Sequence, residues 1–340
     1  MRGYNPTIQF GDASLGVDLN FVRNQSHVLN TRAYEVEYPE MDFAALVPVN
    51  TSYPEWADGV DSFITDKVGA AKWQSGYAKD IPLADVTIEM ISSKMAMYAV
   101  GYRWNVEELG KAQFQNFPLT ARRAESARFS SEVFLWETAL FGAGHPGWSG
   151  LLNSAYATIL ASASTGTAAP TTSFVNAAGL LNKAPGDVIS ELNALITGPA
   201  TNTGVLMSIL ADTMLFPEAV LRAMENTPYG ESAPNKSVLQ YFRENNTYTL
   251  RTGLPLTIRE LPLLARAATT VINGGGRIVA YRNTPDMLEL PMPMPYRFLP
   301  VHQDGPLNYI IPGIGRVGQL QVFRTNMLRY LDGVSPVPAA

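Results

Sequence analysis

The sequence has no cysteine among its 340 residues, and this absence excludes several kinds of chemistry together. Without thiols the chain forms no disulfide, uses no thiolate nucleophile and binds no zinc through cysteine. Any covalent or metal-based stabilisation must therefore come from other residue types.

Charge and long apolar runs are also scarce. Charged residues make up 16% of the chain and the net charge is −5, so no strongly basic face is predicted for reading nucleic-acid sequence. No run of about eighteen apolar residues occurs, and the first residues lack the apolar core of a signal peptide. We expect neither secretion nor a membrane span, and synthesis in the cytoplasm fits.

The remaining composition is that of a globular protein that contacts other proteins over much of its surface. Hydrophobic residues make up 46%, and the length is enough for a sizeable core in two or three domains. Low charge together with 24 prolines favours extensive contact with other protein surfaces. Residues 1–50 contain no convincing amphipathic helix and are predicted to form an extended arm whose order depends on a partner.

Candidate catalytic groups do not combine into a known motif. The histidines His27, His145 and His302 lie far apart and match no metal-ligand spacing. Around Ser149 the sequence superficially resembles a hydrolase elbow, but Leu151 stands where that motif requires glycine. We predict no catalytic residue, no cofactor and no metal site. An uncharacterised hydrolase that uses Ser149 and His145 is kept as an alternative.

A long two-stranded hairpin is predicted from residues 60–65 and 86–104. Apolar and polar residues alternate at the start of the second segment, and the stretch between the two has no apolar periodicity. An isolated hairpin is at best marginally stable in water, so one of this size is expected to rest on another surface. Trp73 and Tyr77 near its tip are the predicted aromatic anchors.

Two helices are predicted after the hairpin. Asn105 can cap the first through its side-chain oxygen, with Glu108 three residues further on. Pro118 removes a backbone donor and should break the element. Residues 119–141 then continue without glycine or proline, for about six turns at roughly 3.6 residues each.

The longer helix has two kinds of surface. Arg122 and Arg123 lie on its charged faces, and Arg128 and Glu132 are spaced for a helical ion pair. A narrow face of small residues, suited to close packing, is formed by Ala121, Ala124, Ala127, Ser131, Leu135 and Thr138.

Alternating helices and strands predict a compact α/β-type region after residue 185. The predicted helices are 188–196, 217–224 and 237–243; the predicted strands are 205–210, 254–261, 277–281, 309–311 and 318–323.

The order of these parts resembles the HK97-like major capsid proteins of tailed bacteriophages, over nearly the whole chain. The strings that carry the resemblance are Gly69-Ala70-Ala71-Lys72-Trp73, Asp80-Ile81-Pro82, Phe141-Gly142 with Gly150-Leu151-Leu152-Asn153, and Arg277-Ile278-Val279-Ala280-Tyr281. The implied class is α+β. Its implied parts are an N-terminal arm (1–50), an E-loop hairpin (51–104), a peripheral domain with a spine helix (105–184), an axial α/β domain (185–295) and a return to the peripheral domain (296–340).

The resemblance also implies a function. Copies of the chain would assemble as pentamers and hexamers into an icosahedral virion shell around double-stranded DNA, bound without sequence specificity, after synthesis in a bacterial host. Scaffolding, portal and decoration proteins are possible partners, and no membrane is involved. An encapsulin-type shell is the alternative of related fold, although residues 1–50 lack the helix typical of encapsulins. Contacts between subunits are predicted at Lys72, Trp73, Tyr77, Asp80, Arg122, Arg123, Arg128 and Glu132.

Overall fold

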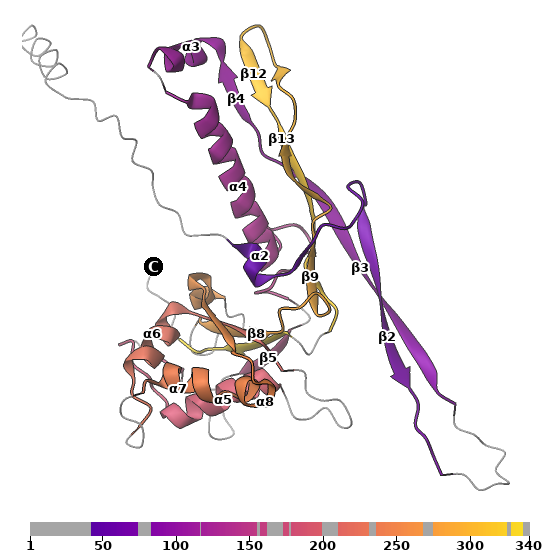
Figure 1. The fold of residues 1–340 in the computed structure, drawn as a ribbon, viewed down its shortest axis with the longest axis vertical. Coiled ribbons are helices and arrows are strands. Elements are labelled where there is room, and N and C mark those ends of the chain that lie inside the picture. Colours follow the sequence, from indigo (N-terminus) through magenta and orange to yellow (C-terminus); the bar gives the residue numbers. More distant parts are fainter. Residues whose placement is uncertain are drawn as a thin grey trace, which may run out of the picture. The chain divides into compact units, whose positions relative to one another are not determined.

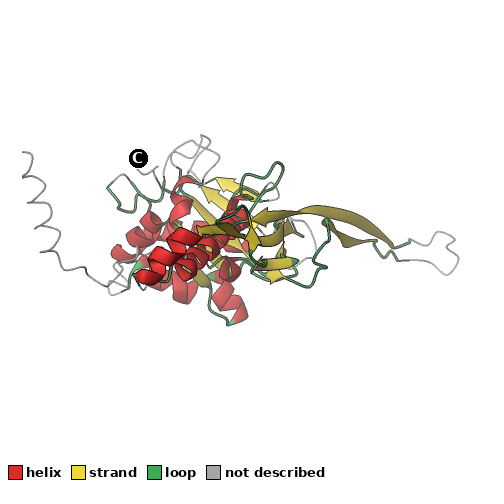
Figure 2. Cartoon of the chain, turned by 90° about the horizontal axis from the view of Figure 1, so that it is seen from above, coloured by secondary structure: helices red, strands yellow, loops and turns green. Residues whose placement is uncertain are grey.

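Two long antiparallel strands form the most extended element of the computed structural model (Figure 1). Strand β2 (Gly59–Val68) pairs with β3 (Asp85–Ala99) in an unbroken ladder from Gly59 opposite Lys94 to Val68 opposite Asp85. The predicted hairpin is confirmed, and its first strand runs three residues further than predicted. Figure 2 shows the two strands leaving the helix-covered part of the chain.

The structure describes most of the chain. The described ranges are 42–73, 83–115, 117–154, 157–161, 173–176, 178–198, 210–230, 236–267, 275–324 and 328–335. Of the predicted arm, residues 1–41 lie outside them; the rest forms the short helix α2 (Phe43–Leu46) and the strand β1 (Val49–Asn50). Leu46 and Val47 are buried, so this part of the segment belongs to the core.

Beyond its partner β2, strand β3 continues into a four-stranded sheet with the order β10-β13-β3-β2, in which β10 is Met294–Phe298 and β13 is Gly313–Gly318. Strand β13 lies just before the strand predicted at 318–323, where the structure has only β14 (Gln321–Val322). The sequence pattern did not indicate β13, because the strand contains glycines and glycine is a poor strand former. A Cβ at Gly313 would meet the Tyr296 ring, and one at Gly315 would meet the Tyr98 ring, so the tyrosines require these glycines.

Two small sheets complete this half. One has the order β11-β12-β4, in which β11 is His302–Gln303, β12 is Asn308–Ile311 and β4 is Tyr102–Asn105. The other has the order β1-β9-β14, in which β9 is Leu288–Pro291. The helix α3 (Val106–Phe114) begins as predicted, with the Asn105 side chain accepting a hydrogen bond from Glu107 N, but it ends four residues before Pro118. The helix α4 (Leu119–Phe141) has the predicted bounds.

The predicted α/β region is built on a mixed five-stranded sheet of order β5-β15-β8-β6-β7. Its strands are Thr158–Ala161, Leu328–Asp332, Arg277–Tyr281, Thr213–Phe216 and Thr257–Glu260. Its helices are α5 (Pro185–Thr197), α6 (Glu218–Asn226), α7 (Val238–Asn245), α8 (Thr247–Thr252) and the 3-10 turn η1 (Pro262–Arg266). The predicted helices and the strands near 254–261 and 277–281 are confirmed. The strand predicted at 205–210 falls almost wholly outside the described residues.

Strand β8 supplies both hydrophobic cores. Its side chains alternate, so Ile278 and Ala280 pack among α5, α6 and α7, while Val279 and Tyr281 pack on the opposite side against α2, α4 and β9. A strand buried on both faces reads as a continuous apolar run, which explains why its bounds were predicted correctly.

Candidate interaction surfaces

One face of the hairpin is apolar and exposed. Residues directly opposite each other in an antiparallel ladder share a face, and the ladder pairs Phe63 with Met90, Thr65 with Ile88 and Lys67 with Val86. Phe63 is 69% exposed and Ile88 is 63% exposed. We call Phe63, Val86, Ile88 and Met90 the hairpin strip. A contiguous exposed apolar surface of this kind marks a site of protein contact.

The end of the hairpin carries the largest exposed side chain. Trp73 is fully exposed, Lys72 beside it is exposed, and Leu83 on the returning side is 88% exposed. Tyr77 and Asp80, two of the predicted contact residues, lie outside the described residues. The described part of the tip therefore offers one indole and one ammonium group to a partner.

Polar contacts fix the root of the hairpin on the neighbouring strands. The Arg316 guanidinium donates to Ala57 O (2.9 Å) and to the Asp58 carboxylate (3.0 Å), and it lies over the Trp56 ring. Gln321 hydrogen bonds to the hydroxyls of both Ser62 and Ser93, one on each strand of the hairpin. These bonds link β13 and β14 to the hairpin and set the direction in which it projects.

Arg123 connects the spine helix α4 to the elements before it. Its Nη1 atom donates to Glu108 Oε2 (2.9 Å) and to Arg103 O (2.6 Å). The Arg123 guanidinium holds the pKa of the Glu108 carboxyl below its ordinary value. Arg122 pairs with Glu125 one turn further on, at 3.8 Å. Two of the predicted contact arginines therefore have partners within their own subunit.

The predicted ion pair between Arg128 and Glu132 is wrong. The Arg128 guanidinium instead lies over the ring of Phe298, 5.7 Å from its centroid, in a cation–π contact with β10. An exposed helical ion pair contributes only a few tenths of a kcal/mol, so a nearby aromatic face competes easily for the arginine. Glu132 remains on the exposed side of α4.

The chain doubles back on itself after α4. Gly142 adopts the left-handed conformation that ends the helix (φ 80°), and Gly150 lies so close to Leu140 that a Cβ there would be 2.3 Å from its carbonyl carbon. The Asn153 side chain accepts from Gly150 N and donates to Phe141 O. The glycines and the asparagine of the motif quoted above thus have a structural role in this turn.

A buried clamp holds that returning segment against the five-stranded sheet. The Tyr330 hydroxyl donates to Leu151 O, and Arg277 Nη1 donates to Leu152 O. The same guanidinium makes a two-pronged ion pair with Asp332, in which Nη2 lies 2.7 Å from Oδ2, and both side chains are at least 97% buried. Burial raises the pKa of the Tyr330 hydroxyl. The clamp joins the end of the spine helix to the α/β region.

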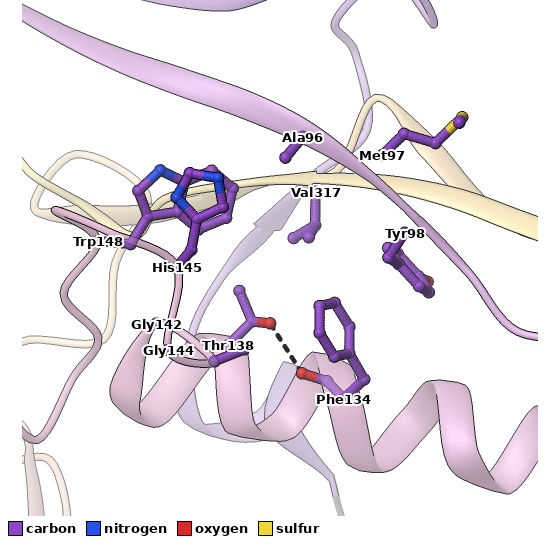
Figure 3. Close-up of a pocket in the computed structure, with 11 residues that line it drawn as sticks. Ala96, Met97, Tyr98, Phe134, Thr138, Gly142, Gly144, His145, Trp148 and Val317 are labelled. Carbon is purple, nitrogen blue, oxygen red and sulfur yellow. Dashed lines mark hydrogen bonds between the residues drawn. The ribbon is translucent and has the colours of Figure 1, made fainter.

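A cavity of about 210 Å³ lies between α4, the turn that follows it, and strands β3 and β13 (Figure 3). No local pattern in the sequence indicates this cavity, because its walls come from segments far apart in the chain. The lining residues are Ala96, Met97, Tyr98, Phe134, Thr138, Gly142, Ala143, Gly144, His145, Trp148 and Val317.

The hydrolase alternative gains no support from the geometry. His145 stacks on Trp148, with ring centroids 4.3 Å apart, and its Nδ1 atom is 3.3 Å from Pro146 O. The Ser149 hydroxyl accepts from Gln319 Nε2 at 3.4 Å, and the described residues include no hydrogen bond between Ser149 and His145. Within the same residues there is no cluster of side chains suited to a metal ion and no helix long and apolar enough to cross a membrane.

Comparisons with known proteins agree with one another. A sequence profile described as "Major capsid protein" matches residues 69–334. No curated protein sequence matches the chain significantly.

Solved structures extend the similarity along the chain. The capsid of Myoviridae phage XM1 has a TM-score of 0.69 at 18% identity, covering 91% of this chain and 97% of that one. The capsid of a native GTA particle has a TM-score of 0.57 at 11% identity and covers 96% of this chain and 99% of that one. The structure titled Mycobacterium phage Adephagia has a TM-score of 0.54 at 13% identity and covers 94% of this chain and 98% of that one. The predicted HK97-like α+β fold is confirmed.

Proposed function

This chain belongs to the major capsid protein family, and from that premise we propose that its copies assemble as pentamers and hexamers into an icosahedral shell around double-stranded DNA. The chain is a structural, shell-forming protein of a phage capsid. We also propose that the chain is made in the cytoplasm of a bacterial host. Scaffolding, portal and decoration proteins are its possible partners in assembly. The division of the chain into five parts at residues 50, 104, 184 and 295 also stays a prediction.

The observation that carries the proposal is the hairpin strip. A two-stranded ribbon with an exposed apolar face is at best marginally stable by itself. A protein surface that covers the apolar face would stabilise it. We therefore expect the hairpin to lie on a neighbouring subunit in the shell. The polar root formed by Arg316 and Gln321 directs the hairpin, so that each subunit reaches its neighbour in the same way.

The charged face of α4 is the second proposed contact. Arg122 and Arg123 already pair within the subunit, yet their partners are solvent-exposed carboxylates that a neighbour's charges can also reach. Arg128, Glu132 and Lys72 are exposed and complete the proposed set. The acidic net charge is compatible with a shell around DNA, because a shell only confines the DNA. It does not need the many Lys and Arg contacts by which a DNA-binding protein neutralises phosphates.

Shortening the hairpin tests the proposal. Residues 69–84 are replaced by Asn-Gly, which closes a two-residue hairpin turn between Val68 and Asp85, the last pair of the ladder. The expected product is a folded subunit with an unchanged circular dichroism spectrum that forms no stable shells in electron microscopy, because a local projection contributes little to its own core. A normal yield of shells would show that the end of the hairpin beyond Val68 is no assembly element.

A matched pair of variants separates the strip from the hairpin as a whole. Phe63→Ser with Ile88→Ser changes the strip, whereas Thr87→Ser with Glu89→Gln changes the opposite face of the same ladder. All four positions are exposed, so each substitution should alter the free energy of unfolding by roughly 0.5 kcal/mol or less, and each pair by about 1 kcal/mol or less. We expect only the first pair to reduce shell yield.

A further inference from the structure

The cavity over α4 has apolar walls. The hydroxyls of two lining residues have partners within the subunit: Thr138 Oγ1 donates to Phe134 O (2.8 Å), and the Tyr98 hydroxyl is 3.2 Å from Ser131 Oγ. The histidine nitrogen described above faces a backbone carbonyl. A charged ligand would find no free counter-charge here, so the cavity suits an apolar group.

Its size and composition favour an aromatic ring. An apolar cavity of about 150 Å³ is enough to bind benzene, and this one measures about 210 Å³. The His145 and Trp148 rings stack on one side and the Phe134 ring faces the space from the helix, as Figure 3 shows. The cavity opens at Gly144 and His145, which are exposed.

The end of the hairpin presents an aromatic ring that has no partner among the described residues. Trp104 stacks on Tyr309 and Trp148 on His145, and Trp56 lies under a guanidinium. The fully exposed Trp73 is the described tryptophan that projects from the end of the hairpin, and no contact of its ring is found among the described residues. Tryptophan is the residue most enriched among the energetically dominant anchors of protein interfaces.

The ring and the cavity of one subunit cannot meet. The cavity lies beyond Lys94, where the ladder pairs with Gly59, and Trp73 lies beyond Val68 at the opposite end. Ten paired residues at about 3.3 Å each separate them by more than roughly 30 Å of regular ladder. A projection and a cavity held apart on one chain are suited to a head-to-tail contact, which forms a ring of subunits when the rotation from copy to copy closes.

We propose that the cavity lined by α4, β3, β13 and the 142–148 turn binds the indole of Trp73 from a second copy of this chain. The inference rests on the proposed function and adds to it the site where the hairpin tip is anchored. It assigns the cavity to a defined occupant, the end of a neighbour's hairpin.

Photochemical crosslinking in assembled particles tests the site directly. Trp73 is replaced by the photoreactive amino acid benzoylphenylalanine, which keeps an aromatic side chain, and labelled and unlabelled copies are mixed before assembly. Illumination should join position 73 of one copy to peptides that contain Met97 or residues 134–148 of another, identified by mass spectrometry. Crosslinks that map to other surfaces of the chain, to a different protein, or within one copy overturn the proposal.

A pair of variants at exposed aromatic rings gives a second measurement. Trp73→Ala should raise the subunit concentration needed for assembly at least about tenfold, as expected for an interface anchor, while Phe114→Ala, at a 90% exposed ring in α3, should change it by less than about twofold. Equal effects of the two variants contradict the inference. Shells that form with unchanged yield from Trp73→Ala overturn the anchor but leave the proposed function intact, whereas absence of shells from the unaltered chain overturns both.

Discussion

The ion pair between Arg277 and Asp332 allows a quantitative test of how the two halves of the subunit are joined. Replacing either residue leaves the other charge buried without its counter-ion, since the two side chains are only 1% and 3% exposed. Breaking a buried pair in this way costs about 3–5 kcal/mol. Domains are stable by only about 5–15 kcal/mol, so Asp332→Leu or Arg277→Met should remove a large part of the total.

The double variant separates charge from packing. Arg277→Met with Asp332→Leu removes both charges, and the remaining cost is expected to be about 1–3 kcal/mol, because Leu152 O loses the hydrogen bond from Arg277. Urea unfolding of the subunit, followed by circular dichroism, gives the three free energies needed for the cycle. Single variants that each cost less than about 1 kcal/mol, or a double variant as unstable as the sum of both, would refute this account of the clamp.

The remaining predictions concern assembly and the turn after α4. Reversing Arg122, Arg123 and Arg128 to Glu together should reduce shell yield far more than it lowers the free energy of unfolding; unchanged assembly across a range of salt concentrations would instead indicate a merely solvated face. Gly150→Ala places a methyl group against the Leu140 backbone and should destabilise the subunit by about 1–3 kcal/mol or more. Gly110→Ala, in α3 with open space around the new methyl group, should stabilise by about 0.5–1 kcal/mol, and a reversed order in thermal unfolding would contradict both predictions.

Elements with local signals were predictable from the sequence. Asn105 caps α3 through its own side chain, Pro118 separates the two helices, and the apolar run of β8 ends where its burial ends. Each signal acts over a few residues, so a single sequence is enough to detect it. The hairpin was found for the same reason, from alternation within one of its strands.

The elements that escaped prediction depend on distant partners. Strand β13 contains Gly313 and Gly315, which lie against the rings of Tyr296 and Tyr98, and these tyrosines lie in other strands. Arg128 has a carboxylate at the right helical spacing, yet its aromatic partner Phe298 comes from the far end of the chain. The cavity likewise needs four segments brought together by folding. Local propensity carries no information about such contacts, whereas the fold determines them.

Electron microscopy of the purified full chain tests the central claim most directly, that this protein assembles into an icosahedral capsid. The account predicts closed shells with pentamers and hexamers, in which each hairpin lies on a neighbouring subunit, and it predicts double-stranded DNA within native particles. Subunits that stay monomeric under all assembly conditions would contradict the claim. Native particles filled with a packaged enzyme and free of DNA would instead identify an encapsulin-type compartment.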